Sequence, residues 1–512
     1  MIDDLNSIDN HKSSILPYLA ARFLMVSFLK IIAGPAAAAL CYILLQWLQP
    51  DEQVSRMACI AAWMALWWLL ESVPMAVTSL LPVFLFPLAG IMSTDKIAPF
   101  YMNDVLMLFI GGFLLAFAME RWHLHRRIAL RIISFIGTDY HKILFGLMLA
   151  TYLISMWVSN TATTLMMMPT AMAVIARIEE MTGQRNNKIG VAMLLGIAYS
   201  ASIGGTATLV GTPPNMIFLS QFKASFPNEA PVSFLQWSLF GIPFSFAYLL
   251  ICYALLVKLN MKEKMVAEPH HHGIFKKELD SLGKMTFEEK MVTLLFLVMT
   301  LLWFTRADLP IGSITIRGWS SFLPHPDFFQ DGTVAIFIAT LLFVIPSKSK
   351  QGEMLMDWES AKKLPFSIIL LFGGGFALAK GFAASGLADW LGAQMQGIGA
   401  LPDFVIILLV CTFMTYLSEV ASNVAITQLM LPVLAAVAVA ADIPPLLLMI
   451  PATFAASFGF MLPVATAPNT IIFTGEKLTV KDMLRAGIWL DILGIIWLTL
   501  AMNIFGRWVF GV

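Results

Sequence analysis

The sequence predicts an all-α polytopic membrane protein, and its composition, its apolar runs and an internal repeat support this fold class. Of the 512 residues, 59% are hydrophobic and only 12% are charged, and the mean hydropathy is +0.80. Soluble domains are about one-quarter charged. Apolar runs of about 17–25 residues recur from Ile31 onward, long enough to cross a hydrocarbon core of roughly 30 Å. They are too long for barrel strands.

Composition also excludes several kinds of partner and site. The formal net charge is zero and no basic tail is present, so nucleic acid is not expected as a partner. Four cysteines lie singly in apolar stretches: Cys41, Cys59, Cys252 and Cys411. Without a CxxC pair, they predict neither a zinc site nor a disulfide framework. Three adjacent histidines at 270–272 could bind a metal weakly, but we interpret them as part of a solvated loop.

Eleven apolar segments are predicted to span the membrane. They are 31–48, 57–73, 75–91, 103–119, 189–222, 237–257, 289–304, 332–346, 364–384, 444–473 and 485–510. Two further apolar regions, 143–177 and 403–441, are long enough for two legs each and are interrupted by polar Ser-Asn pairs. We interpret these two regions as re-entrant helical hairpins, each of which enters and leaves on one side.

The distribution of Lys and Arg predicts the orientation of the chain. Four basic clusters fall on one side when eleven spans and two hairpins are counted: 121–142, 258–290, 348–363 and 477–485. The segment 385–403 has neither residue and falls on the other side. Because basic loops stay in the cytoplasm, we expect a cytoplasmic N-terminus and an external C-terminus in the plasma (cell inner) membrane. The first hairpin then opens from the cytoplasm and the second from the exterior.

An internal repeat relates the two halves of the chain. Matches 263 residues apart are "GGFLLA" from Gly111 with "GGFALA" from Gly374, Ser155 with Ser418, Ser159-Asn160 with Ser422-Asn423, and Pro169 with Pro432. "GTPPNMIF" and "ATAPNTIIF" share a Pro-Asn core at an offset of 254 residues. The predicted orientation makes the two halves inverted. Inverted repeats with broken helices are typical of secondary transporters, whose binding sites lie near the midplane.

The polar hairpin tips have the chemistry to hold both a cation and an anion. Ser, Asn and Thr are preferred helix N-caps, and a helix that restarts at a tip directs its N–H groups and positive dipole end toward an anion. The preceding leg ends there with free carbonyl oxygens, which are hard ligands suited to Na⁺. Ser155 and Ser418 precede the tip serines by one turn and share their face. Neither tip contains a charged residue.

The two Pro-Asn stretches, 204–215 and 461–469, are predicted to be unwound, because Pro breaks a helix and Gly permits close backbone approach. An alternative is that these polar residues only cap turns and that the prolines only kink helices. The occurrence of the motifs in both halves of an inverted repeat favours a binding site instead. Glu419 could face a substrate pathway or pair within the hairpin base. Glu71 and Asp491 are interpreted as structural, and Lys380 as reaching outward.

The motifs "SNTATT", "SNVA", "ASIGGTATLVGTPPN", "FMLPVATAPN" and "ESVPMAVTSLLP" resemble those of the divalent anion/sodium symporter family. The resemblance extends from about Trp63 to Gly506. It implies a homodimer, a scaffold domain and a transport domain that moves as an elevator. The implied scaffold covers 23–140 and 289–400, the transport domain 141–257 and 401–512, and a cytoplasmic loop 258–288.

The resemblance also implies the site residues. One Na⁺ site would use Ser155, Ser159, Asn160 and backbone near Gly211. A second would use Ser418, Ser422, Asn423 and backbone near Ala465. The substrate carboxylates would lie between the two, against Asn160, Thr161, Thr212, Asn423, Val424, Thr466 and Ala467. Two residues depart from the family pattern: Val424 lacks the hydroxyl of Thr161, and Ala467 stands where the family often has proline.

We therefore expect Na⁺-coupled symport of a small dicarboxylate such as succinate, malate or fumarate, with at least two Na⁺ ions. The alternatives are a citrate or sulfate symporter and a Na⁺-independent dicarboxylate exchanger. An enzyme is not expected, because the sequence contains neither HExxH nor GxSxG and the tips lack acids and histidines. The inverted repeat argues against a channel. Membrane lipid, the dicarboxylate and a second copy of the chain are the expected partners.

Overall fold

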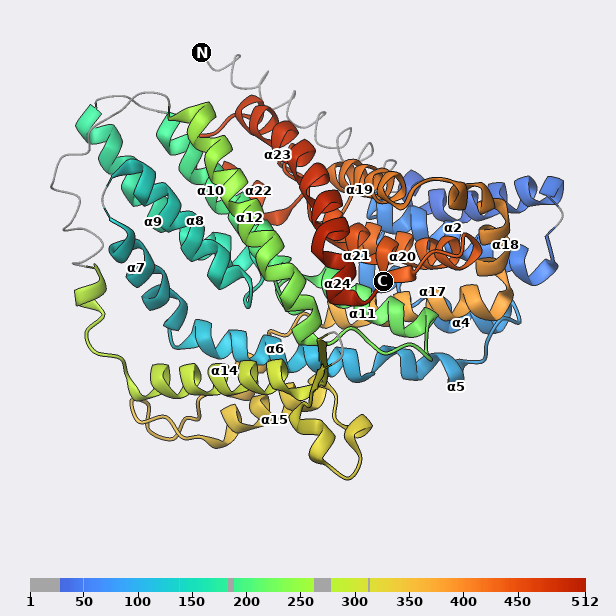
Figure 1. Cartoon of the computed structure of the whole chain (residues 1–512), viewed down its shortest axis with the longest axis horizontal. Coiled ribbons are helices and arrows are strands. Elements are labelled where there is room, and N and C mark those ends of the chain that lie inside the picture. Colours follow the sequence, from blue (N-terminus) through green and yellow to red (C-terminus); the bar gives the residue numbers. More distant parts are fainter. Residues whose placement is uncertain (1–27, 49, 138, 183–187, 262–277, 312–313) are drawn as a thin grey trace, which may run out of the picture.

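The computed structural model describes residues 28–48, 50–137, 139–182, 188–261, 278–311 and 314–512 (Figure 1). Within these residues, ten helices are long and apolar enough to cross a membrane, starting with Phe28–Leu48. The predicted all-α membrane class is confirmed. A short antiparallel hairpin, in which β1 (Leu309–Ile311) pairs with β2 (Ile314–Ile316), is a small addition that the sequence did not predict.

The first half of the chain runs from α2 to α12. Its helices are α2 (Glu52–Leu70), α3 (Met75–Thr78), α4 (Leu81–Leu88), α5 (Thr94–Ile97), α6 (Asp104–Arg121), α7 (Leu124–Ile136), α8 (Tyr140–Ser155), α9 (Asn160–Thr182), α10 (Lys188–Gly205), α11 (Pro213–Ser225) and α12 (Phe234–Asn260). A 3₁₀ turn, Ala98–Tyr101, precedes α6.

The second half repeats this order. Its helices are α14 (Phe287–Arg306), α15 (Asp331–Val344), α16 (Trp358–Ala361), α17 (Phe366–Ser385), α18 (Leu387–Gln394), α19 (Asp403–Val420), α20 (Asn423–Ala440), α21 (Pro445–Ala455), α22 (Ala467–Phe473), α23 (Val480–Ala501) and α24 (Arg507–Phe510). A π-helical turn, Met502–Gly506, joins α23 to α24. Three 3₁₀ turns lie at Trp319–Phe322, Pro326–Phe328 and Gln396–Ala400.

Two helical hairpins form at the predicted positions. The first is α8 and α9, which reverse direction over residues 156–159, and the second is α19 and α20, which reverse at residues 421–422. In Figure 1 they lie on opposite sides of α12 and α23. Pro169 and Pro432 lie inside the two second legs. Both hairpins therefore present their Ser-Asn pairs at the point where the chain turns.

Two spans are broken where the Pro-Asn motifs predict it. Residues 206–212 separate α10 from α11, and residues 456–466 separate α21 from α22. Prolines occupy the first two positions of α11 and the second position of α22. Proline is favoured there because the missing N–H has no intrahelical partner in the first turn. Each motif thus starts a new helix after an irregular segment.

Glycines allow the two halves to pack in the same way. A Cβ atom on Gly111 of α6 would lie 2.5 Å from the backbone of Ala335 on α15. At the equivalent position, a Cβ atom on Gly374 of α17 would lie 2.6 Å from the backbone oxygen of Ser79, next to α3. Only glycine permits such close helix contact. The sequence repeat around "GGF" therefore corresponds to a repeated packing contact.

Among the described helices of more than four residues, α7 and α18 were not predicted, because the region around α7 was assigned to a basic loop and that around α18 to an external segment. Both are short; they begin at equivalent positions, Leu124 and Leu387. Along α7, Leu130 and Ile133 are buried while most arginines face outward, which is the pattern of an amphipathic helix. Arg127 is an exception: its side chain is buried and pairs with Glu289 at 2.8 Å. The high charge of this segment is the reason that it was predicted to be a loop.

Several boundaries also differ from the prediction. The segment 75–91 was predicted as one span and consists of α3 and α4, separated by Ser79 and Leu80. Residues 262–277 of the predicted loop 258–288, including the three histidines, lie outside the described residues. The division into scaffold and transport domains stays a prediction.

We predict that Gly111→Ala lowers stability by about 1–3 kcal/mol, because the added methyl group overpacks against backbone that cannot rotate away. Thermal unfolding in detergent measures the effect. Gly397→Ala is the matched control, since no atom lies within 4 Å of a Cβ atom at that position. Equal melting temperatures for the two variants would contradict the prediction.

Candidate functional site

A serine and an asparagine meet at the tip of the first hairpin. Ser155 ends α8 and Asn160 begins α9. The Ser155 hydroxyl oxygen lies 2.7 Å from Asn160 Oδ1 and 2.8 Å from the carbonyl oxygen of Ala201 on α10. The Thr164 hydroxyl donates to the backbone carbonyl of Asn160 at 2.8 Å. A hydroxyl has one proton, so Ser155 can donate to only one of these two oxygens at a time. Three oxygens therefore lie close together where the hairpin tip meets α10.

The second hairpin reproduces this arrangement. The Ser418 hydroxyl oxygen lies 2.7 Å from Asn423 Oδ1 and 2.7 Å from the carbonyl oxygen of Ala456, which follows α21. The Thr427 hydroxyl donates to the carbonyl of Asn423 at 2.7 Å. Ser155 and Ser418 are both fully buried. Two hairpins with different surrounding sequences thus hold the same side-chain geometry.

The asparagines of the two Pro-Asn motifs hydrogen-bond to the backbone of the irregular segments that precede them. Asn215 Nδ2 donates to the carbonyl oxygens of Gly205 at 3.0 Å and Thr208 at 2.7 Å. Asn469 Nδ2 donates to those of Gly459 at 2.8 Å and Leu462 at 2.9 Å. Both asparagines are fully buried. Each side chain replaces helical hydrogen bonds that the broken backbone cannot make.

Buried oxygens without hydrogen-bond partners lie at equivalent positions in both halves. Within the described residues, Asn215 Oδ1 and Asn469 Oδ1 have none, and neither have the hydroxyls of Ser202 and Ser457. A buried unpaired polar atom costs about 1–3 kcal/mol, so such atoms call for a ligand. Amide, hydroxyl and carbonyl oxygens are hard donors, which fits Na⁺. This chemistry agrees with the two cation sites that the resemblance implies.

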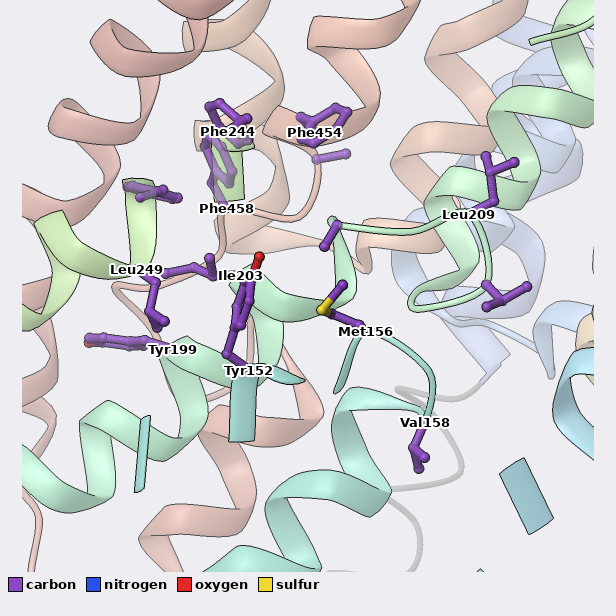
Figure 2. Packing of buried hydrophobic residues seen from close by; sticks show 14 of the residues in the cluster. Tyr152, Met156, Val158, Tyr199, Ile203, Leu209, Phe244, Leu249, Phe454 and Phe458 are labelled. Atoms are coloured by element: carbon purple, nitrogen blue, oxygen red, sulfur yellow. The ribbon is translucent and has the colours of Figure 1, made fainter. Parts of the chain in front are cut away.

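Apolar side chains surround the two breaks. Figure 2 shows Tyr152 and Ile203 beside the first break, and Phe244, Phe454 and Phe458 grouped nearby. The ring centroids of Phe244 and Phe454 are 5.1 Å apart. Such a wall lowers the local dielectric constant and strengthens electrostatic interactions at the site.

The predicted site residues fall into three groups by their exposure. Gly211, Thr212 and Ala465 are buried, whereas Thr161 and Ala467 are exposed. The remaining tip and cap residues are half-buried: Ser159, Asn160, Ser422, Asn423, Val424 and Thr466. The tips are therefore more exposed than Ser155 and Ser418, which lie one helical turn before them.

Contacts between the halves bring the two half-sites into one central region. Helix α9 packs against α22, and α11 packs against α20, which is the equivalent contact in the repeat. Lys477 after α22 also pairs with Glu179 on α9 at 2.9 Å. Each hairpin therefore rests on the broken span of the other half.

Glu419 binds protein backbone. Its side chain accepts hydrogen bonds from the N–H groups of Met461 at 2.8 Å and Leu462 at 3.0 Å, and the residue is 2% exposed. The interpretation that Glu419 pairs within the hairpin base is therefore wrong: the residue lies near the hairpin tip, and its partners belong to the broken span between α21 and α22.

Several residues of the site were missed by sequence reasoning. They are Asn215 and Asn469, Gly205 and Gly459, Ser202 and Ser457, and the carbonyls of Ala201 and Ala456. The asparagines belong to the repeated Pro-Asn core, so their recurrence was an available signal. The carbonyls carry no sequence signal, because every residue has one.

We predict that Gly205→Ala disrupts the first half-site. Its Cβ atom would lie 2.4 Å from Asn160 Oδ1 and would displace that side chain. Gly459→Ala is the matched variant of the second half-site, where the nearest atom, Ala465 Cβ, is 3.1 Å away and the clash is milder. Thermal shift as a function of Na⁺ concentration measures the loss, which we expect to be at least about tenfold in apparent Na⁺ affinity for Gly205→Ala and smaller for Gly459→Ala. A larger loss in Gly459→Ala would contradict the assignment.

Comparison with known proteins identifies the family of this chain. Residues 28–512 match the model described as the sodium:sulfate symporter transmembrane region. The chain is 38% identical to the sodium-dependent dicarboxylate transporter SdcS of Staphylococcus saprophyticus, over 98% of this chain and 96% of the relative. It is 41% identical to SdcS of Staphylococcus aureus strain RF122, over 87% and 85% of the two chains.

Solved structures share the fold at low identity. The Alcanivorax borkumensis YdaH transporter has a TM-score of 0.53 and 13% identity, covering 80% of this chain and 85% of that one. Neisseria gonorrhoeae MtrF, of a class of antimetabolite efflux pumps, has a TM-score of 0.53 and 14% identity, covering 81% and 83%. With its family match over nearly the whole length, the chain belongs to the divalent anion:sodium symporter family, a family of membrane transporters and not of enzymes.

Proposed function

We propose that this protein is a secondary active transporter that takes up a small dicarboxylate, such as succinate, malate or fumarate, together with Na⁺. The observation that carries the proposal is the pair of Ser–Asn contacts, 2.7 Å long in each half, that fixes two equivalent hairpin tips. A dicarboxylate has two charged ends, and two equivalent half-sites offer one set of donors to each. The SdcS relatives are named sodium-dependent dicarboxylate transporters, which supports this substrate class.

Each half-site would contribute cation ligands and carboxylate ligands. Ser155, Ser159, Asn160 and the backbone near Gly211 would hold one Na⁺; Ser418, Ser422, Asn423 and the backbone near Ala465 would hold the other. The carboxylates would contact the tips and the starts of the broken helices: Asn160, Thr161, Thr212, Asn423, Val424, Thr466 and Ala467. Neither tip contains a Lys or Arg. Na⁺ would therefore supply the positive charge that a desolvated dianion requires.

At least two Na⁺ ions per dianion are needed for concentrative uptake. Moving two negative charges into a cell against 100 mV costs about 4.6 kcal/mol, and two Na⁺ cancel this cost. Their concentration gradient then drives uptake by about 1.4 kcal/mol per tenfold gradient per ion.

An elevator motion accounts for an asymmetry between the hairpins. The second leg of the first hairpin exposes Leu165 by 55%, whereas the equivalent Gln428 is 1% exposed. Gln428 Nε2 donates to the carbonyl of Leu371 on α17 at 2.7 Å. Gln428 thus ties the second hairpin to α17, and we take the exposed Leu165 to mean that the first hairpin has no such tie at the equivalent position. This would be an inward-facing arrangement if the first hairpin opens to the cytoplasm. Rigid movement of the transport segments, 141–257 and 401–512, past the scaffold would exchange the environments of the two hairpins.

The assembly would be a homodimer in the plasma membrane, with the N-terminus cytoplasmic and the C-terminus outside. Citrate or sulfate symport is the second candidate function. Val424 is the observation that favours it, because the second tip lacks the hydroxyl that Thr161 offers in the first.

Uptake of radiolabelled succinate into proteoliposomes, with Na⁺ or K⁺ outside, tests the function. We predict Na⁺-stimulated uptake that Asn160→Ala and Asn423→Ala each abolish, because each removes one cation ligand and one substrate contact. Gel filtration should show both variants folded. Normal transport by both variants would refute the site, and a reversal potential that gives fewer than two Na⁺ would refute the coupling.

We also predict that Val424→Thr alters substrate preference more than Na⁺ dependence, because in the proposed site position 424 would contact the substrate, whereas Ser418 and Asn423 would hold the ion. Competition of succinate uptake by citrate and sulfate measures the preference, and Na⁺ titration provides the comparison. A change confined to Na⁺ dependence would place Val424 at the cation site instead.

A further inference from the structure

A cavity of about 390 Å³ lies between α7 and the first hairpin. Part of its lining is apolar and buried, since Leu130 of α7, Ile154 of α8 and Met167 of α9 are each at most 3% exposed. Another part is charged and exposed: the side chains of Arg126 on α7 and of Glu278 before α14 are 56% and 41% exposed. The cavity therefore has a buried apolar end and an exposed charged end.

Arg126 makes only a weak contact in the described structure. Its ion pair with Glu278 is 3.9 Å long, and a long, exposed ion pair contributes little to stability. The next residue, Arg127, is in contrast buried and pairs with Glu289 at 2.8 Å. A guanidinium group has five N–H donors. Most of the donors of Arg126 are therefore available to a ligand in the cavity.

The second half of the chain contains an equivalent cavity, of about 350 Å³, where α18 and α17 meet α20. Four of its lining positions are those of the first cavity moved by 263 residues: Ala388, Asp389, Ala393 and Pro432 correspond to His125, Arg126, Leu130 and Pro169. Among the described residues, neither a lysine nor an arginine lines this second cavity, and Asp389 stands in place of Arg126. The fold thus forms both cavities, but a basic side chain is present in the first alone.

Helix α7 has the features of a helix at the membrane surface. It lies at the outer edge of the molecule, beside α8 and α9 (Figure 1). Phe135, near its C-terminal end, is 91% exposed. A basic amphipathic helix with an exposed aromatic ring is typical of the lipid headgroup region. In the predicted orientation α7 faces the cytoplasmic leaflet, whose surface is negative because it contains anionic lipids.

We infer that the cavity between α7 and the first hairpin binds an anionic phospholipid, with its phosphate at Arg126 and part of an acyl chain against Leu130, Ile154 and Met167. Guanidinium groups bind phosphate through charge-assisted hydrogen bonds, and basic pockets between helices at the cytoplasmic side bind anionic headgroups. The apolar lining favours a lipid over a dicarboxylate, since a hydrated dianion would lose water there without gaining a partner. This inference goes beyond the proposed function and does not rest on it.

The test measures lipid binding to the full-length protein in a neutral detergent by native mass spectrometry. Three probes separate headgroup from chain: dioleoyl phosphatidylglycerol, dioleoyl phosphatidylcholine with the same chains and no net charge, and glycerol phosphate without chains. Arg126→Gln removes the proposed phosphate contact, and Glu278→Gln removes the carboxylate that competes for it. Arg131→Gln is the matched control, because Arg131 is an exposed arginine of the same helix that does not line the cavity.

We expect phosphatidylglycerol to bind at least about fivefold more tightly than phosphatidylcholine, and Arg126→Gln to remove most of this preference. Arg131→Gln should stay within about twofold of the unmodified protein. Glu278→Gln should bind phosphatidylglycerol about twofold more tightly or better, because Arg126 then has no competing carboxylate. Glycerol phosphate should bind at least about tenfold more weakly than the lipid, because it lacks the chains that fill the apolar end.

Four results would overturn the inference. They are equal binding of the two lipids, an equal loss in Arg126→Gln and Arg131→Gln, binding of glycerol phosphate as tight as that of the lipid, and competitive displacement of the lipid by succinate. The second result would indicate general surface charge, the third a site for small anions, and the fourth a part of the substrate route. If Arg126→Gln does not fold, Glu278→Gln decides: tighter lipid binding supports the inference, and unchanged or weaker binding overturns it.

Discussion

The contact between a buried serine hydroxyl and an asparagine side chain is the interaction on which the rest of the site depends. It occurs once in each half, at 2.7 Å, and the same serine also reaches a carbonyl oxygen of the neighbouring broken span. One hydroxyl therefore joins the hairpin tip to the segment that completes the half-site. This junction positions the starts of α9 and α20, the neighbouring backbone carbonyls and the proposed cation ligands, which ordinary helix packing in lipid could not provide.

Glycine makes the junction possible. The tips lie so close to the broken spans that a methyl group on Gly205 would overlap Asn160, and the same constraint acts at a distance from the site where Gly111 and Gly374 bring helices into backbone contact. Without a water-filled interior, membrane helices depend on such close packing for specificity. The repeat thus preserves small residues as strictly as polar ones.

Symmetry of the fold coexists with asymmetry of its chemistry. The halves share the Ser–Asn contact and the Pro-Asn closure, yet they differ at Thr161 and Val424, and at Met156 and Glu419. The first pair lies at the hairpin tips, and the second lies just before the turn of each hairpin. In a transporter, ion binding and substrate release place different demands on the site, so two copies of one motif are expected to differ. The halves also differ in burial, since Leu165 is exposed whereas the equivalent Gln428 is buried.

The sequence by itself determined the membrane class, most of the apolar spans, both hairpins and both breaks, because lipid admits only helices whose polar interruptions are buried. It also identified Ser155, Asn160, Ser418 and Asn423, since the repeat made them visible twice. The sequence did not reveal α7, because its arginines suggested a loop and its buried face is visible only in the structure. It also did not identify the carbonyls of Ala201 and Ala456. Nor did it decide between two roles for Glu419. Those features depend on which segments meet in space, and only tertiary packing brings residue 419 to residues 461 and 462.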